Sequence, residues 1–343
     1  MGAYNRFAFM ATLIRDRLSG GRTPLVVVLN VTFRCNLKCG YCYGQYFNRD
    51  DKDFTTQELS DLIDGLGKLG TRSITLGGGE PLIREDIGQI IRKIKSKGIE
   101  CGMNTNGTLI PSRIDELKSI DMVTVSIDGP KEMNDANRTE GSFEKIIAGI
   151  DAALQAGIKT HITTVLTRNN YNCVDWIVSL AKEKGIQAEF NLLFHQSQEK
   201  NDSDRFMPDN EHLRKAVLRV GELKAGGAPI LFSEKVYRYV AKWPDYRKRL
   251  VMAAEPDFTP IPCYAGRFMM FIDADGWVYP CVQLIDVFKA LDFRKTGIKK
   301  AWDNCATHSC KACYFPCFNE FNQIMSLQPK IIIGQILSTL RGH

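Results

Sequence analysis

The sequence predicts an α/β fold, a partial (β/α)6 TIM-like barrel followed by a small cysteine-rich C-terminal domain. Two observations support this prediction. From residue 24 onward, short β-rich runs alternate with amphipathic helical runs, which is typical of parallel strands joined by right-handed crossovers. Only six such units are present, too few for a closed eight-stranded barrel. In addition, the chain has 11 cysteines, and they concentrate after residue 260.

The elements follow in order from these patterns. Strands are expected at 24–31, which contains the β-branched run Val26-Val27-Val28, and at 72–77, 99–104, 121–127, 159–166 and 187–194. Helical periodicity predicts helices near 55–69, 85–97, 111–118, 142–156, 173–184 and 209–226. In parallel α/β folds, ligands bind at the carboxyl ends of the strands, so the loops that follow these strands form the expected site.

A less regular stretch follows the last expected strand. It contains a polar loop at 195–202 and a proline-rich link at 254–262. The expected division is an N-terminal amphipathic segment at 1–23, the barrel at 24–230, a linker at 231–262, the cysteine-rich domain at 263–320 and an amphipathic tail at 321–343.

The composition excludes several classes of protein. With 44% hydrophobic and 24% charged residues, the chain has the balance of a globular protein, and no apolar run approaches the roughly 20 residues that span a bilayer. The N-terminus lacks the apolar core of a secretory signal, so we expect a cytoplasmic protein whose clustered cysteines bind metal. The net charge of +6 is spread along the chain, which argues against a nucleic-acid partner.

Three cysteines, Cys35, Cys39 and Cys42, fall within eight residues after the first expected strand. A cubane iron–sulfur cluster usually has four thiolate ligands. Three thiolates would hold three corners and leave one iron open to bind and activate a substrate. A zinc site or a group of buried thiols is the alternative. A structural zinc site needs four ligands, however, and the next cysteine is Cys101.

The spacing C-x3-C-x2-C, with Tyr41 before the last cysteine, resembles that of the radical S-adenosylmethionine (SAM) enzymes. The run Gly77-Gly78-Gly79-Glu80-Pro81 follows the second expected strand and matches the GGEP element of that family. The resemblance covers roughly residues 24 to 200. It implies that the amino and carboxylate groups of SAM bind the open iron of a [4Fe-4S] cluster, and that reduction releases a 5′-deoxyadenosyl radical. It also implies a one-electron donor such as a flavodoxin or ferredoxin.

The same resemblance implies roles for side chains at the strand ends. Gly78, Gly79 and Glu80 would contact the SAM amino group, and Tyr41 would pack near the adenine. Ser126, Asp128 and Arg138 would lie near the SAM carboxylate, to which an arginine can form charge-assisted hydrogen bonds. Asn104 and Asn106 would reach the ribose, although Asn106-Gly107 is equally an ordinary turn. Leu166 would line the space under the adenine.

The C-terminal cysteines form a second group. Cys263 and Cys281 flank a predicted β-hairpin with its turn at Asp275-Gly276. Cys310 and Cys313 follow in a C-x2-C pair, and this order resembles the SPASM/twitch extensions of radical SAM enzymes. It implies a second, auxiliary [4Fe-4S] cluster held by these four cysteines, with Cys317 or Cys305 able to replace one of them. A zinc ribbon is the alternative. We expect Cys101 and Cys173 to be buried apolar residues.

The substrate is less clearly indicated. Asn191, Phe194 and His195 fall at the end of the sixth strand, and His195 is a candidate acid–base group or a plain loop residue. About 23 residues precede the first strand, too few for a leader-peptide-binding domain, which favours a small-molecule or lipid substrate. The predicted function is hydrogen abstraction from an unactivated C–H bond. The alternatives are a peptide maturase that makes thioether, epimerised or carbon–carbon crosslinked products, and a non-catalytic iron–sulfur electron carrier.

Both ends of the chain are apolar and basic. Phe7, Met10, Leu13, Ile14 and Leu18 have helical spacing, and residues 330–341 combine isoleucines and leucines with Lys330 and Arg341. Such segments can lie on a membrane surface or a lipid substrate, which would make the protein peripheral to the membrane. They can equally be helices that pack on the open barrel. The sequence does not indicate the oligomeric state.

Overall fold

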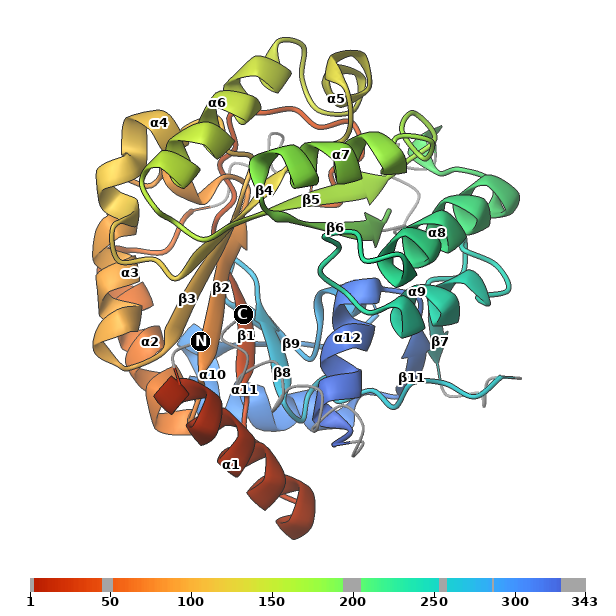
Figure 1. The fold of residues 1–343 in the computed structure, drawn as a ribbon. Helices are drawn as coiled ribbons and strands as arrows, with labels where there is room; N and C mark the ends of the chain where they lie inside the picture. The colour runs from red at the N-terminus through yellow and green to blue at the C-terminus, as the bar shows by residue number, and fades with distance from the viewer. Residues whose placement is uncertain (1–2, 45–51, 194–204, 253–257, 286, 328–343) are drawn as a thin grey trace.

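The computed structural model describes residues 3–44, 52–193, 205–252, 258–285 and 287–327. Its centre is a nine-stranded sheet in the order β10-β9-β8-β1-β2-β3-β4-β5-β6 (Figure 1). The first six strands pair in parallel and in sequence order: β1 Val26–Thr32, β2 Ser73–Gly78, β3 Glu100–Thr105, β4 Met122–Ser126, β5 Thr160–Leu166 and β6 Gln187–Leu192. This confirms the predicted parallel partial barrel.

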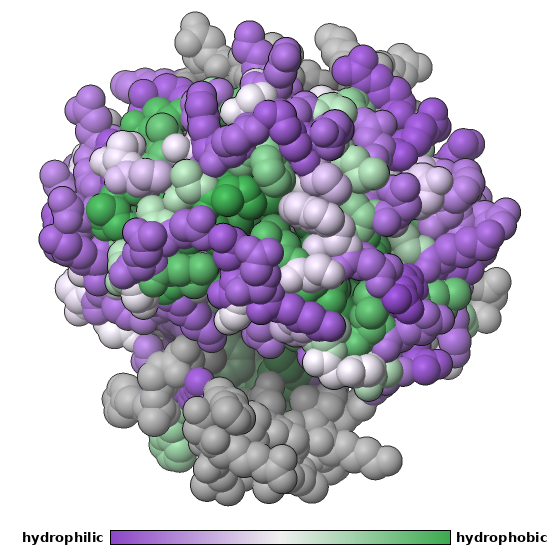
Figure 2. All heavy atoms as spheres, turned by 45° about the horizontal axis from the view of Figure 1, so that its top comes forward, coloured by the Kyte–Doolittle hydropathy of each residue, from purple (hydrophilic) through white to green (hydrophobic). Residues whose placement is uncertain are grey.

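The helices lie around the outside of these strands (Figure 1). They are α1 Ala3–Ser19, α2 Thr56–Leu69, α3 Ile87–Ser96, α4 Ile110–Arg113, α5 Lys131–Asn137, α6 Ser142–Gln155, α7 Val174–Lys184, α8 Asn210–Ala225, α9 Glu234–Ala241, α10 Phe293–Thr296, α11 Ile298–Asn304 and α12 Pro316–Met325. The helix expected at 111–118 is split into α4 and a 3-10 turn, Ile114–Leu117. Seen from the side of α6 and α7, the surface is mostly hydrophilic with small apolar patches (Figure 2).

Local sequence signals set the ends of α2. The Thr55 hydroxyl accepts from the Glu58 backbone N–H, and the Glu58 carboxylate accepts from the Thr55 N–H, which is a complete capping box. Gly70 ends the helix with a left-handed φ of 91°. The face that this helix buries in the core consists of Leu59, Leu62, Ile63 and Leu66.

The C-terminal part returns to the first strand of the barrel. β8 Met269–Ile272 pairs in parallel with β1, and β9 Trp277–Tyr279 and β10 Leu291–Asp292 extend the sheet beyond it. Gly276 has a φ of 90° in the turn between β8 and β9, as the predicted hairpin requires. A second small sheet joins β7 Leu250–Met252 to β11 Cys310–Cys313. The large sheet therefore runs across the boundary expected at residue 263.

The concave face of the sheet, here called the lumen, is polar along β5 and β6. Thr163, Val165, Glu189 and Asn191 are half-buried, whereas the residues between them are buried. Because successive side chains in a strand point to opposite faces, the half-buried residues line the lumen and the others face the helices. Leu166 is 0% exposed and belongs to the main hydrophobic core. The expected contact of Leu166 with adenine stays a prediction, and Val165 is the neighbour of Leu166 that faces the lumen.

Helix α1 packs against the C-terminal part through one face. Phe9 and Leu13 lie in a buried cluster with Tyr264, Phe268 and Met325. This contact agrees with the expectation that the N-terminal segment packs on the barrel. No helix in the described part of the chain is long and apolar enough to cross a membrane. Most of the expected tail, residues 328–343, lies outside the described residues.

Candidate functional site

The three closely spaced cysteines lie in the loop that follows β1, here called the cysteine loop (residues 33–43). Cys35, Cys39 and Cys42 are each partly accessible, and their charges affect one another. Burial raises the pKa of the Cys35 thiol to about 11 and that of Cys39 to about 12. Neutral thiols are therefore favoured without a metal, whereas bound iron stabilises the thiolate. The donor set fits three corners of a cubane cluster.

The glycines after β2 touch the cysteine loop. The Gly79 N–H donates to the Thr32 carbonyl (2.9 Å), and the Glu80 N–H donates to the Arg34 carbonyl (2.9 Å). Gly78 has a φ of 124°, and a Cβ on Gly79 would lie 2.2 Å from the Arg34 carbonyl oxygen. These glycines were expected to admit a ligand. In the structure, the group that approaches them is the backbone of the cysteine loop.

Asp53 and Arg84 hold the start of the cysteine loop, and the sequence analysis did not identify them. The Asp53 carboxylate accepts from the Thr32 hydroxyl (2.8 Å) and forms an ion pair with Arg34 (2.8 Å). The Arg84 guanidinium donates to the carbonyl of Val31 (3.0 Å). No sequence motif marks either residue, because each contact joins segments about 20 or more residues apart.

Glu80 and Asn106 join three loops. The Glu80 carboxylate is 0% exposed and accepts from the Thr105 hydroxyl (2.8 Å), the Asn106 N–H (2.7 Å) and the Leu82 N–H (3.1 Å). Burial raises the pKa of Glu80 to about 6. The Asn106 side-chain amide donates to Asn36 in the cysteine loop (2.9 Å). Both side chains were expected to contact SAM, but these contacts are within the protein. Of the two expected ribose contacts, only Asn104 is exposed.

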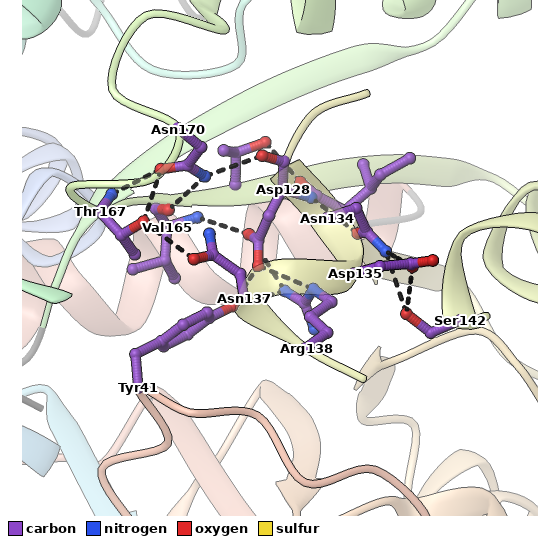
Figure 3. A network of polar contacts seen from close by, with 12 residues as sticks. Tyr41, Asp128, Asn134, Asp135, Asn137, Arg138, Ser142, Val165, Thr167 and Asn170 are labelled. Carbon is purple, nitrogen blue, oxygen red and sulfur yellow. Dashed lines mark hydrogen bonds and ion pairs between the residues drawn. The ribbon is translucent and has the colours of Figure 1, made fainter. Parts of the chain in front are cut away.

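A buried ion pair lies beside the cysteine loop (Figure 3). The Asp128 carboxylate, 0% exposed, pairs with Arg138 (2.9 Å) and accepts from the Tyr41 hydroxyl (2.7 Å). Arg138 also donates to the Tyr41 hydroxyl oxygen (2.8 Å). Burial alone would lower the pKa of Arg138, but the Asp128 charge outweighs it and holds the pKa above its ordinary value. Arg138 was expected at the SAM carboxylate. Here its charge is balanced by Asp128.

This network also fixes the far side of the cysteine loop. The Val165 N–H donates to Asp128 (3.3 Å), and the Asn170 amide donates to the Asp128 carbonyl (2.8 Å). At the end of α5, the Asn137 carbonyl accepts from the Gly40 N–H (3.0 Å). The hydroxyl of Thr139 accepts from the Lys38 N–H (2.9 Å). Ser126 lies at the end of β4, half-buried on the lumen face.

The four expected ligands of the second cluster line one cavity. Cys263, Cys281, Cys310 and Cys313 surround it together with apolar side chains that include Leu250, Met269 and Leu284. Burial raises the pKa of Cys313, and the neighbouring Cys263 and Cys310 raise it further. In the described part of the chain, no three Cys, His, Asp or Glu side chains converge closely enough for a single metal ion. Four thiols around a cavity fit a cubane cluster better than one zinc ion.

The remaining cysteines do not line this cavity. Burial raises the pKa of the Cys317 thiol and the nearby Glu189 carboxylate raises it further, so Cys317 lies towards β6. Cys305 is 0% exposed, and its thiol donates to the Ala301 carbonyl (3.5 Å). Cys101 and Cys173 are buried, as expected. Phe194 and His195 lie outside the described residues.

The lumen contains a carboxylate that the sequence analysis missed. The Asn191 amide donates to the Glu189 carboxylate (3.3 Å) and to the Thr163 hydroxyl (3.3 Å). The Asn191 carbonyl oxygen is buried and accepts no hydrogen bond from the residues that the structure describes. Burial raises the pKa of Glu189 to about 7, with no contribution from a Lys or Arg in the described part of the chain. The alternation of polar and apolar residues at 187–192 could have identified these side chains.

Comparison with known proteins agrees with this geometry. The model of the radical SAM superfamily matches residues 29–181, which include the cysteine loop, the glycine turn and the Asp128–Arg138 pair. This chain carries a radical SAM domain. Its cofactors are SAM and a [4Fe-4S] cluster, as in the family. The predicted resemblance is thereby confirmed.

The curated relatives that match this chain are named for different activities. Fe-coproporphyrin III synthase of Methanosarcina barkeri is 35% identical over 166 residues, 47% of this chain and 42% of that relative. This match therefore spans less than half the length of that relative. Mycofactocin maturase MftC of Mycolicibacterium smegmatis is 28% identical over 275 residues, 78% of this chain and 67% of that relative.

A solved structure shares the fold. Streptococcus suis SuiB bound to S-adenosylmethionine superposes with a TM-score of 0.66 and 19% identity, covering 84% of this chain and 68% of SuiB. At this coverage the match shows that the overall architecture is that of a known fold.

The close contact at Gly79 predicts that one added methyl group will disturb the cysteine loop. Gly79→Ala should displace the cysteine loop, lower the unfolding free energy by on the order of 1–3 kcal/mol and prevent full iron loading. Gly67→Ala on α2 is the matched control, because its Cβ meets nothing closer than 3.9 Å. Iron content and absorbance after anaerobic reconstitution measure the loading. Equal iron content in the two variants would contradict the proposed constraint.

The buried ion pair predicts that three substitutions will lower the free energy of unfolding by different amounts. Asp128→Ala should lower the unfolding free energy by about 3–5 kcal/mol, because it leaves Arg138 buried without its partner. Tyr41→Phe removes one hydroxyl and should cost only about 1–2 kcal/mol. Asp175→Ala, which breaks an exposed pair with Arg219, should leave stability almost unchanged. Denaturant unfolding would show a different order if the pair were unimportant.

Proposed function

We propose that this chain is an enzyme that abstracts a hydrogen atom from an unactivated C–H bond of a polar small molecule. The observation that carries the proposal is the position of the cysteine loop, directly after β1 at the carboxyl ends of the parallel strands. Its three thiols would hold three irons of a cubane cluster and would leave the fourth iron open for SAM. When bound there, the cluster and SAM supply a 5′-deoxyadenosyl radical upon one-electron reduction.

The residues around the loop would hold the cofactors in a fixed position. Cys35, Cys39 and Cys42 would bind the first cluster, and Ser126 and Asn104 would face SAM from the lumen. Glu80 and Asn106 would act indirectly, since together they connect the glycine turn to the cysteine loop. The buried Asp128–Arg138 pair would orient Tyr41 beside the cluster.

The second cluster would be held by Cys263, Cys281, Cys310 and Cys313. With four thiolates its irons have no free position for a substrate, so its role would be to accept or donate electrons. A flavodoxin or ferredoxin would reduce the first cluster.

The lumen supports a polar substrate. Glu189, Thr163 and the unpaired Asn191 carbonyl oxygen provide hydrogen-bond acceptors on one face of the sheet. The half-buried Glu189 carboxylate has no cationic partner among the described residues, and a ligand with N–H donors would pair with it. A lipid hydrocarbon chain would leave these groups unpaired, so the lumen favours an amine or amide over a lipid.

A peptide maturase is the second candidate. It is supported by the similarity to mycofactocin maturase, which extends over 78% of this chain, and by a fold shared with SuiB. A peptide also carries the N–H donors that the lumen acceptors require. Tight binding of a short precursor peptide encoded beside this gene would favour the maturase, whereas turnover of a free amine would favour the small-molecule enzyme.

The two groups of cysteines are predicted to have different functions. The fully loaded protein should contain about eight irons, as two cubanes require, and form 5′-deoxyadenosine with dithionite. Changing Cys35, Cys39 and Cys42 to Ala should remove about four irons and all SAM cleavage. Changing Cys263 and Cys281 should also lower the iron content but leave SAM cleavage measurable. Cys101→Ala is the control, because this buried thiol lies near the start of β3, away from the carboxyl ends of the strands.

Two outcomes would reject the enzyme proposal. The first is the absence of SAM cleavage in the fully loaded protein. The second is an electron paramagnetic resonance spectrum that SAM leaves unchanged, since a non-catalytic electron carrier has no open iron for SAM. Equal loss of cleavage in both cysteine variants, with folded protein, would contradict the separate roles of the two clusters.

Glu189 predicts a pH dependence of stability. Its folded pKa of about 7 lies above the ordinary value of 4.5, so its contribution is most favourable below pH 4.5 and is lost as pH rises through 7. Glu189→Gln should remove this loss, which is on the order of 2–3 kcal/mol. The melting temperature of the variant relative to the unsubstituted protein should therefore rise between pH 5 and pH 8. The exposed Glu183→Gln is the control. Parallel curves for Glu189→Gln and the unsubstituted protein would contradict the prediction.

A further inference from the structure

Helix α1 has a second apolar face that the described part of the fold leaves exposed. Phe7 is 76% exposed, Ile14 42% and Leu18 85%. Together with the exposed Ala11, they follow each other at intervals of four, three and four residues, so they form one line along the helix. Phe9 and Leu13 on the other face are buried. Figure 1 shows α1 at the edge of the molecule, projecting beyond the sheet.

The charges beside this apolar line have one sign. Arg6 and Arg15 are exposed, and Arg17 lies over the ring of Tyr264 at 4.9 Å. The one acidic residue of the helix, Asp16, is 3% exposed and accepts from Arg15 (2.7 Å). The exposed side of α1 therefore combines large apolar side chains with positive charge, which is the pattern of helices that bind anionic interfaces.

Two parts of this protein could cover the apolar line on α1: residues 328–343 and a second copy of the chain. Their charges disfavour both. Residues 328–343 continue from a point near α1, because Met325 shares a buried cluster with Phe9 and Leu13. That segment contains Lys330, Arg341 and no acidic residue, so its charge has the same sign as that of α1. A second copy would likewise place arginines opposite arginines. The positive charge of α1 is instead complementary to an anionic surface.

We propose that α1 binds in the plane of an anionic phospholipid bilayer, with Phe7, Ile14 and Leu18 inserted at the interface. The buried face of the helix then remains attached to the C-terminal part, so binding requires no unfolding. The proposal is independent of the substrate and of the radical chemistry. It assigns the exposed face of α1 to phospholipid head groups and their adjacent acyl chains.

Vesicle flotation tests this proposal with the purified, cluster-loaded chain. The protein should float with vesicles of phosphatidylcholine and phosphatidylglycerol (about 7:3), at least about tenfold more than with phosphatidylcholine alone, and less at high salt. The double variant Phe7→Ser/Leu18→Ser should lose about tenfold or more of this binding. Leu218→Ser is the control, because Leu218 is an exposed leucine (43%) on α8, away from α1. All variants should retain SAM cleavage.

Three outcomes would overturn the proposal. The first is no binding to anionic vesicles, and the second is equal binding by the double variant and the Leu218→Ser control. The third is a dimer in sedimentation analysis that the double variant converts to a monomer, since a second copy would then cover the apolar line.

Discussion

The close approach between the glycine turn and the cysteine loop is the constraint on which the rest of the site depends. Two backbone hydrogen bonds join Gly79 and Glu80 to the Thr32 and Arg34 carbonyls, and no side chain fits between the two segments. The same turn carries the Glu80 carboxylate into the interior, where it holds the loop after β3. Cysteine spacing alone would not place three thiols correctly. Their position comes from backbone contacts with a segment more than 40 residues away.

The other side of the cysteine loop is fixed by charge. Asp128 and Arg138 form a buried pair, and such a pair specifies one arrangement because separating the charges in a dry environment is costly. Tyr41 and the backbone N–H groups of Lys38 and Gly40 are connected to this region through α5. The loop is therefore held between a close backbone contact on one side and a hydrogen-bonded ion pair on the other. Under the proposed function, this arrangement would keep the geometry of the site constant during the reaction.

Strand β1 connects the two cysteine groups mechanically. Its carboxyl end leads into the cysteine loop. The edge of β1 that does not pair with β2 pairs with β8, and the β8–β9 hairpin leads to Cys281. One proposed ligand of the auxiliary cluster, Cys281, thus follows a strand of the same sheet that carries the proposed SAM site. Under the proposed function, this shared strand would keep the two clusters at a constant separation during turnover.

The sequence by itself determined the local features of this protein. The periodicity predicted the six parallel strands to within about two residues, because strand and helix patterns depend on neighbours along the chain. The hairpin at Gly276 and the spacing of Cys35, Cys39 and Cys42 are local in the same sense. The seven-residue helix α5 and the split at 110–117 were missed, because short elements carry little periodicity.

The tertiary structure decided everything that depends on contacts between distant segments. It placed Val165 and not Leu166 on the lumen face, since the direction of a side chain follows from the register of its strand. It showed that Glu80 and Asn106 join loops, and it revealed Asp53, Arg84 and Glu189, whose roles come from partners that no motif contains. It also brought Cys263, Cys281, Cys310 and Cys313 to one cavity and left Cys305 and Cys317 outside it. The physical reason is that burial and hydrogen bonding depend on packing in three dimensions, which residue spacing along the chain does not encode.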